Sequence, residues 1–182
     1  MRRLFFALWP EPAERARLQE LAALASPLPG ARALAALDLH VTLCFLGSVS
    51  EAVLSGLLVR ANRIDLPAFE LEFDAVEHWR EARILAATAT AVPAPATALV
   101  HALSAAAREL GLNIEDRPWR AHVTLARGIA QAAPAAAVPA PPLVLFARRF
   151  YLAQSQRLAA DVRAGADCAQ RYCRLGSWML RC

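Results

Sequence analysis

The chain has 182 residues, a formal net charge of +4 and a hydrophobic fraction of 57%. No apolar run approaches the roughly eighteen residues that a membrane-spanning helix needs. All twenty basic residues are arginine, which excludes a phosphate-binding loop with its lysine and any mechanism through a lysine adduct. An arginine-rich, basic chain is compatible with a nucleotide or nucleic-acid partner, because the planar guanidinium suits phosphate.

Hydrophobic periodicity and turn residues predict an alternation of strands and helices. The start, "MRRLFFALWPEP", imitates a signal peptide, but its apolar run ends after about six residues, so we interpret it as the first strand of a cytoplasmic protein. The predicted elements, in chain order, are a strand at 3–9, a helix at 10–25, a strand at 39–46, a helix from the Ser50 cap to about Asn62, strands at 69–79 and 82–90 joined by a hairpin turn around Arg80–Glu81, a helix at 95–111, a strand at 121–127, an alanine–proline loop at 131–142, and strands at 143–156 and 171–180.

This order repeats a strand–helix–strand pattern in the two halves of the chain. The helices are too few to cover both faces of a large parallel sheet. We therefore expect an α+β fold: a single domain over residues 1–182, built from two pseudo-symmetric lobes. Each lobe is expected to be an antiparallel sheet with helices on its outer face, and the lobes are expected to form a central cleft.

The cysteines, Cys44, Cys168, Cys173 and Cys182, form no C-x-x-C pair and have no histidine at zinc-like spacing. We expect reduced structural or incidental thiols, no metal and no cofactor.

The tetrapeptide His-Val-Thr-Leu occurs twice, beginning at His40 and at His122. Alternation along a strand places each histidine and the threonine two residues later, Thr42 or Thr124, on one face, roughly 6.6 Å apart. If the two strands face each other across a cleft, the cleft receives two imidazoles and two hydroxyls. That set supplies a base, an acid and hydrogen bonds for a negatively charged group.

One such histidine by itself is more often a satisfied core residue than a catalytic group. The exact repetition changes this interpretation, because a second histidine would be followed by Val-Thr-Leu by chance with a probability below about one in a thousand. His78 and His101 lack a repeated neighbourhood, and we expect surface or helix-packing roles for both.

Two H-x-T-x motifs at this separation, with "RLFFAL" at the start, "LHVTLCFLG", "WRAHVTLAR" and the closing "FYLAQSQ … YCRLGSWML", resemble the two-histidine phosphoesterase superfamily. Within it the chain is similar to the RNA 2′,3′-cyclic phosphodiesterases, also called 2′-5′ RNA ligases. The resemblance implies that His40 and His122 are catalytic and that Thr42 and Thr124 bind phosphate.

The same resemblance implies a phosphate contact from Arg127 and a base-stacking role for Phe45. Both residues lie at an odd offset from their histidine, which is the wrong face of a regular strand. They reach the cleft if the strand ends, twists or bulges there, and the glycines that follow, Gly47 and Gly128, favour such an irregularity.

The implied activity is metal-independent hydrolysis of terminal RNA 2′,3′-cyclic phosphates to 2′-phosphates, possible in reverse as 2′-5′ ligation. We assign His122 as base and His40 as acid for hydrolysis. The expected partner is RNA or an oligonucleotide with a 2′,3′-cyclic phosphate end, and the expected protein is a cytoplasmic monomer of RNA processing with no membrane association.

Three alternatives stay open at this point. A related two-histidine enzyme would act on ADP-ribose cyclic phosphate or 2′-5′ oligoadenylate, a non-catalytic RNA-binding module would use the cleft without turnover, and a zinc protein would use the two histidines as ligands but lacks an evident third one.

Overall fold

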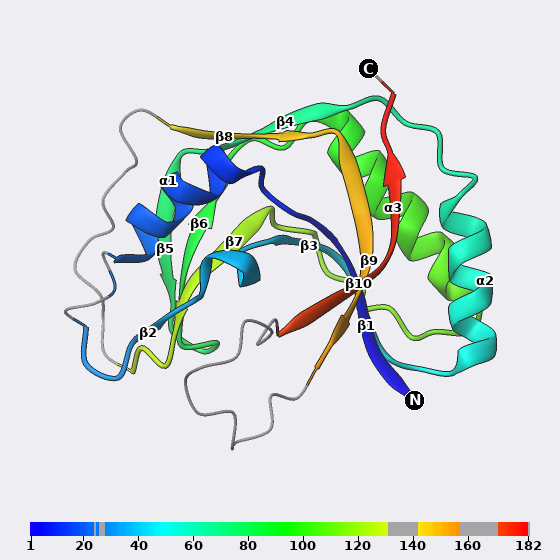
Figure 1. Ribbon diagram of the computed structural model, residues 1–182, viewed down its shortest axis with the longest axis horizontal. Helices are drawn as coiled ribbons and strands as arrows, with labels where there is room; N and C mark the ends of the chain where they lie inside the picture. Colours follow the sequence, from blue (N-terminus) through cyan, green and yellow to red (C-terminus); the bar gives the residue numbers. More distant parts are fainter. Residues whose placement is uncertain (24, 26–27, 131–141, 157–170, 182) are drawn as a thin grey trace.

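Antiparallel strands, several of them consecutive in the chain, combine with α-helices, which confirms the expected α+β class (Figure 1). The computed structural model describes residues 1–23, 25, 28–130, 142–156 and 171–181. Its elements are β1 (Arg2–Leu8), α1 (Pro12–Ala23), β2 (Arg32–Ala33), a 3-10 turn η1 (Ala36–Asp38), β3 (Val41–Val49), α2 (Glu51–Ala61), β4 (Phe69–Phe73), β5 (Ala75–Trp79), β6 (Ile84–Thr88), α3 (Ala94–Glu109), β7 (His122–Arg127), β8 (Leu143–Ala147), β9 (Arg149–Ser155) and β10 (Tyr172–Met179).

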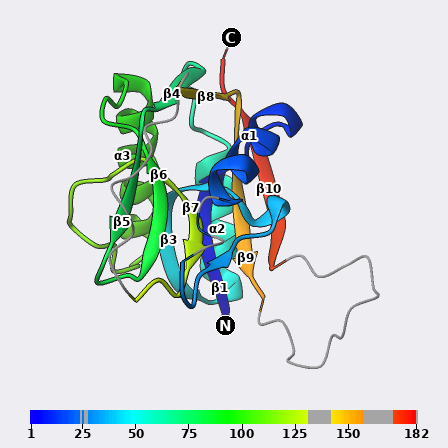
Figure 2. The same ribbon diagram turned by 90° about the vertical axis from the view of Figure 1, so that its left-hand side faces the viewer.

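The main sheet consists of two halves that meet between β3 and β7. One half has the strand order β10-β9-β1-β3, and the other has the order β7-β6-β5, with β2 paired to β7. Within the described residues, β3 and β7 are joined by the pair Val41–Val123. Figure 2 shows β5 and β6 on one side of this join and β9 and β10 on the other. The two halves are the lobes that the internal repetition predicts.

The helices lie against the strands that carry the repeated tetrapeptide. α1 contacts β7 and β8, whereas α3 contacts β3 and α2. The hydroxyl of Ser50 accepts a hydrogen bond from the backbone N–H of Val53 at 3.4 Å, as expected for the cap of α2. Gly111 follows α3 with φ +78°, the left-handed conformation that ends helices. The predicted helix boundaries therefore hold to within about two residues.

Two predicted strands are wrong because each is divided between two sheets. The segment 69–79 breaks at Asp74 into β4 and β5, and the segment 143–156 breaks at Arg148 into β8 and β9. β4 pairs with β8 in a separate two-stranded sheet, while β5 and β9 join the main sheet.

The burial pattern explains the breaks. Phe69, Leu71 and Phe73 are buried at alternate positions, but the next buried residue is Val76, so the alternation slips by one residue at Asp74. The same slip occurs at Arg148. A continuous strand would turn one of its apolar sets into solvent. The break lets both sets reach the core, and the Asp74 carboxylate stabilises it by accepting hydrogen bonds from the Thr90 backbone N–H and hydroxyl.

Large apolar side chains from the main sheet and from the two-stranded sheet fill one continuous core, including Phe6, Phe73 and Phe150. No described helix is long and apolar enough to cross a membrane. Cys44 is a buried free thiol and Cys173 a half-buried one, whereas Cys168, Cys182 and the expected alanine–proline loop up to residue 141 lie outside the described residues.

Candidate active site

The two repeated tetrapeptides meet at the centre of the sheet. Val41 pairs with Val123 in antiparallel register. Extending that register by one residue in each direction sets His40 across from Thr124 and Thr42 across from His122. The two motifs are thus related by a local twofold axis through the valine pair, and each histidine has the other motif's threonine as its cross-strand neighbour.

Burial separates the two faces of these strands as the alternation predicts. Val41 and Val123 are fully buried, and the leucines that follow two residues later are buried as well. The two histidines and two threonines keep partial exposure on the opposite face. The apolar residues therefore anchor the strands, and the polar residues remain available to a ligand.

A β-bulge in β3 turns Phe45 to the face of the histidine. Thr42 and Cys44 pair with consecutive residues of β1, which leaves Leu43 as an extra residue. Leu43 and Cys44 are both buried, and Phe45 is 48% exposed. A second register shift skips Leu46, directly before Gly47, so the strand is irregular at the glycine as well.

β7 repeats the bulge at the matching place. Thr124 and Ala126 pair with consecutive residues of β6, so Leu125 is the extra residue. Leu125 and Ala126 are both buried, and Arg127 returns to the face of Thr124. The bulge again precedes the glycine of the motif, Gly128. Both residues at odd offsets thus reach the face that carries the histidines.

The imidazoles are oriented by equivalent hydrogen bonds. Nδ1 of His40 lies 2.6 Å from the carbonyl oxygen of Asp38, and Nδ1 of His122 lies 2.8 Å from the carbonyl oxygen of Arg120. A carbonyl oxygen only accepts, so each Nδ1 carries the proton in these bonds. Nε2 is left as the nitrogen that exchanges a proton with a ligand, on both histidines.

An aromatic cage surrounds His40. The ring stacks on Trp9 with a centroid distance of 5.1 Å, lies 5.1 Å from Phe5, and meets the edge of Tyr172 at 4.8 Å. Burial among these rings lowers the pKa of His40 from 6.5 to about 4, and the positive charge of Arg127 acts in the same direction. His40 is therefore neutral near pH 7 in the free protein.

His122 lies in a more charged setting. Its ring packs against Trp79 at 4.6 Å, and the guanidinium of Arg120 lies 4.8 Å over the centre of the Trp79 indole. Burial lowers the pKa of His122, and Arg120, Arg117 and Arg127 lower it further through their positive charges.

The cavity beside His40 collects most of the expected site residues. It has a volume of about 680 Å³ and is lined by His40, Thr42, Phe45, Arg127, Arg171 and Tyr172, among others. Nε of Arg127 is buried and has no hydrogen-bond partner among the described residues. A buried guanidinium nitrogen without a partner is costly, and a phosphate oxygen would satisfy it. Thr124 does not line this cavity, although it lies on the same face of its strand as His122.

Sequence reasoning did not single out the aromatic residues around the histidines. Trp79 and Arg120 lie near His122, and Arg120 stands two positions before it in "WRAHVTLAR", which was a usable signal. Trp9 and Tyr172 come from the two ends of the chain, and no local pattern links them to His40.

Of the other histidines, His101 is exposed, and the His78 ring lies 3.3 Å from the carbonyl oxygen of Ile129. In the part of the chain that the structure describes, no group of three or more His, Cys, Asp or Glu side chains is arranged to hold a metal ion.

An antiparallel α+β fold with two H-x-T strands joined at its centre is the architecture of the two-histidine phosphoesterases. A family model described as LigT like Phosphoesterase matches residues 8–85. The RNA 2′,3′-cyclic phosphodiesterase of Escherichia coli strain K12 is 34% identical over 131 residues, which are 71% of this chain and 74% of that protein. The chain belongs to the LigT-like phosphoesterase family.

Solved structures agree over the whole length. A crystal structure described as a phosphoesterase has a TM-score of 0.85 at 30% identity and covers 99% of this chain and 98% of its own. E. coli LigT complexed with 3′-AMP has a TM-score of 0.86 at 28% identity, with 98% of both chains covered.

Proposed function

We propose that this protein is an RNA 2′,3′-cyclic phosphodiesterase that opens terminal 2′,3′-cyclic phosphates to 2′-phosphates. One observation carries the proposal. Two imidazoles, each oriented by a hydrogen bond from Nδ1 to a backbone carbonyl oxygen, lie on a face that also presents Thr42 and Arg127. The name of the E. coli relative and the binding of 3′-AMP by LigT support the same substrate class. We further propose that the enzyme acts as a monomer in the cytoplasm and takes part in RNA processing.

In this proposal the phosphate lies between the two motifs. Arg127 reaches one non-bridging oxygen through its buried Nε, which has no partner among the described residues. The hydroxyls of Thr42 and Thr124 donate hydrogen bonds to the phosphate oxygens, where negative charge increases in the transition state. Phe45, exposed at the mouth of the cavity, stacks on the base of the terminal nucleoside.

Hydrolysis then requires one base and one acid. We assign His122 as the base that takes a proton from water as its oxygen bonds to phosphorus. His40 gives its proton to the 3′-oxygen as the P–O3′ bond breaks, and the product is a 2′-phosphate with a free 3′-hydroxyl. The terminal nucleoside and its departing oxygen lie on the His40 side in this assignment, because His40 and Arg127 line one cavity, which Phe45 also reaches.

His40 must be protonated to act as the acid, although its pKa in the free protein is about 4. A bound phosphate favours the charged imidazole and offsets the positive charge of Arg127, so substrate binding raises this pKa. In ligation a 5′-hydroxyl replaces water: His122 takes its proton as O5′ bonds to phosphorus, and His40 again protonates the departing 3′-oxygen, which leaves a 2′-5′ linkage. The roles exchange when that linkage is cleaved in the opposite direction.

Incubating the purified protein with an oligonucleotide that ends in a 2′,3′-cyclic phosphate, in the presence of EDTA, tests the proposal. We expect a 2′-phosphate product at undiminished rate. A panel with ADP-ribose cyclic phosphate and 2′-5′ oligoadenylate compares the related substrates. No turnover of the cyclic oligonucleotide, or turnover that EDTA abolishes and a divalent ion restores, contradicts the proposal.

A further inference from the structure

A second cavity lies beside His122. It has a volume of about 430 Å³ and extends between β3, α3 and the segment 113–120. Thr42 and Phe45 line this cavity and also the cavity beside His40, so the two cavities adjoin at these residues. Each histidine therefore lines one cavity, with the proposed phosphate position between them.

The walls of the second cavity suit a flat heterocycle. Trp119 lines it, and the indole Nε1–H of Trp119 donates to the carbonyl oxygen of Thr42 at 2.9 Å, which holds the ring in place. Val100 and Ile114 add aliphatic surface. An apolar cleft with fixed aromatic rings is typical of nucleobase sites, because every base offers a π-face for stacking.

The rim of this cavity carries two arginines, each paired with a carboxylate. Both carboxylate oxygens of Glu77 accept hydrogen bonds from Arg120, at 3.0 and 2.9 Å, and one also accepts the Trp79 indole N–H at 2.8 Å. Burial opposes ionisation of Glu77, but these hydrogen bonds outweigh it and lower the pKa of its carboxyl. The Arg120 side chain stays 59% exposed, and Arg117, which pairs through Nε with Glu115 at 3.1 Å, is 76% exposed. Two exposed guanidinium groups at the mouth suit a phosphodiester that leads away from the bound nucleoside.

The geometry of phosphoryl transfer relates the two cavities. The entering and departing oxygens lie roughly in line on opposite sides of phosphorus. The terminal nucleoside carries the departing 3′-oxygen and is proposed to lie on the His40 side. Whatever carries the entering oxygen must then lie on the His122 side. Water needs no cavity of 430 Å³ with an apolar wall, whereas a nucleoside does.

We propose that the cavity beside His122 binds the nucleoside that bears the 5′-oxygen of a second RNA strand. This inference rests on the proposed function. In ligation, the 5′-hydroxyl loses its proton to His122 as O5′ bonds to phosphorus, and the 3′-oxygen departs with the proton of His40. In cleavage of a 2′-5′ linkage the same atoms move in reverse: the 3′-hydroxyl attacks, the P–O5′ bond breaks, and a 2′,3′-cyclic phosphate and a 5′-hydroxyl are released. The enzyme is thus built for a 5′-hydroxyl strand as well as for water.

Two substrates distinguish an effect on binding in this cavity from an effect on the catalytic step that both reactions share. Adenosine 2′,3′-cyclic phosphate needs only the His40 side, whereas adenylyl-(2′→5′)-adenosine places its second nucleoside on the His122 side. The readout is the ratio of kcat/KM for the dinucleotide to kcat/KM for the cyclic mononucleotide. Any effect on the histidines acts on both reactions and largely cancels in this ratio.

Ile114→Asp places a charge on the apolar wall, and Arg117→Ala removes charge from the rim. We expect Ile114→Asp to lower the ratio at least about tenfold, the scale of one lost base stack. Arg117→Ala should lower it further for a dinucleotide that carries an additional 3′-phosphate than for one that ends in a hydroxyl.

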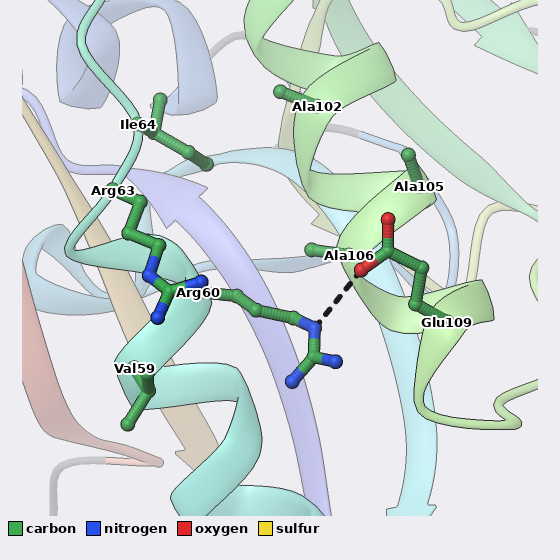
Figure 3. A pocket seen from close by; sticks show the side chains of 8 residues that line it. All are labelled: Val59, Arg60, Arg63, Ile64, Ala102, Ala105, Ala106 and Glu109. Atoms are coloured by element: carbon green, nitrogen blue, oxygen red, sulfur yellow. Dashed lines mark hydrogen bonds and ion pairs between the residues drawn. The ribbon is translucent and has the colours of Figure 1, made fainter.

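Matched controls come from the groove between α2 and α3 (Figure 3). Ile64→Asp and Arg63→Ala make the same chemical changes there. Ala102, Ala105 and Ala106 line this groove, on the opposite face of α3 from Val100, because successive helical residues turn by about 100°. Both controls should leave the ratio within about twofold of wild type.

The outcomes separate the two proposals. An unchanged ratio in both Ile114→Asp and Arg117→Ala overturns the second nucleoside site, as does a wild-type enzyme that hydrolyses the cyclic mononucleotide but cannot cleave the dinucleotide. Equal loss on both substrates also overturns it, because the cavity then holds the terminal nucleoside itself. Failure of the wild type on every cyclic phosphate refutes the proposed function instead.

Discussion

The two histidine sites share a backbone plan but differ in their neighbours. Each histidine has an Nδ1–H bonded to the carbonyl two residues before it, and each threonine is followed by a bulge. His40 then lies in an aromatic cage, whereas His122 packs against an indole that carries Arg120 on its ring. The bulges present an aromatic ring, Phe45, on one side and a cation, Arg127, on the other. The repeated strand thus supplies geometry, and the unrepeated neighbours decide what each half contributes.

The strongest test of this equivalence removes each histidine. His40→Ala and His122→Ala should each lower kcat/KM on a 2′,3′-cyclic phosphate by roughly 10²–10⁴-fold, as expected for loss of a general acid or base. The double variant should lose much less than the product of the two factors, because the histidines act as a unit. Full activity in either single variant excludes the two-histidine mechanism.

A sulfur substitution distinguishes the two histidines. In a 2′-5′ dinucleotide with sulfur at the bridging 5′ position, the departing thiolate needs no proton. Cleavage of this substrate should therefore recover in His122→Ala but not in His40→Ala, since His122 is the acid in that direction. Recovery in His40→Ala alone reverses the assignment.

Substitutions of the matching residues Phe45 and Arg127 should change different kinetic constants. Arg127→Ala should lower kcat by roughly 10²–10³-fold, because it removes a charged donor to the transition state, and Arg127→Lys should restore only part. Phe45→Ala should mainly raise KM, by the roughly 1–3 kcal/mol of one base stack. Steady-state kinetics on one cyclic substrate gives both effects. Equal changes in kcat and KM for Arg127→Ala and Phe45→Ala would contradict separate roles, with Arg127 stabilising charge in the transition state and Phe45 stacking on the base.

The two threonines offer a smaller contrast. Thr42→Ala and Thr124→Ala should each cost ~1–3 kcal/mol in transition-state stabilisation, less than the histidines, because each removes one hydrogen bond to a charged group. Thr42 should be the more sensitive of the two, since it lines both cavities and Thr124 lines neither. Wild-type kinetics in both variants would show that the threonines form the strands but do not contact the phosphate.

The burial of His40 in its aromatic cage should make the free energy of unfolding depend on pH. Its pKa is lowered from 6.5 to about 4 in the folded protein. Between pH 6.5 and pH 4 the unfolded chain binds a proton at His40 that the folded protein does not bind. The contribution of His40 to the free energy of unfolding is therefore complete above pH 6.5 and decreases as the pH falls towards 4. The share of His40 is as much as ~3 kcal/mol. Urea unfolding at pH 7 and pH 4.5 should show a larger difference for wild type than for His40→Gln, and equal differences would contradict the burial of a neutral His40.

Most helices and the strands of the repeated motif could be predicted because their signals are local. Ser50, Gly111 and the buried valines and leucines of the two tetrapeptides act over a few residues, and the structure agrees with them. The breaks at Asp74 and Arg148 were missed because a strand that changes sheets keeps an extended backbone on both sides. Its only local sign is a slip in the apolar alternation, and that slip has meaning only once the partner strands are known.

By itself, the sequence determined that two His-x-Thr faces exist and that each has an apolar reverse side, because alternation is a property of any strand. Only the tertiary structure decided how they are used. The pairing of Val41 with Val123 brings residues eighty-two positions apart into register, and the bulges at Leu43 and Leu125 turn Phe45 and Arg127 to the ligand face. Trp9 and Tyr172 reach His40 from opposite ends of the chain. The glycines after Phe45 and Arg127 indicated that an irregular strand was possible there. The contacts between distant segments depend on how whole sheets pack, and no local pattern in the chain encodes those contacts.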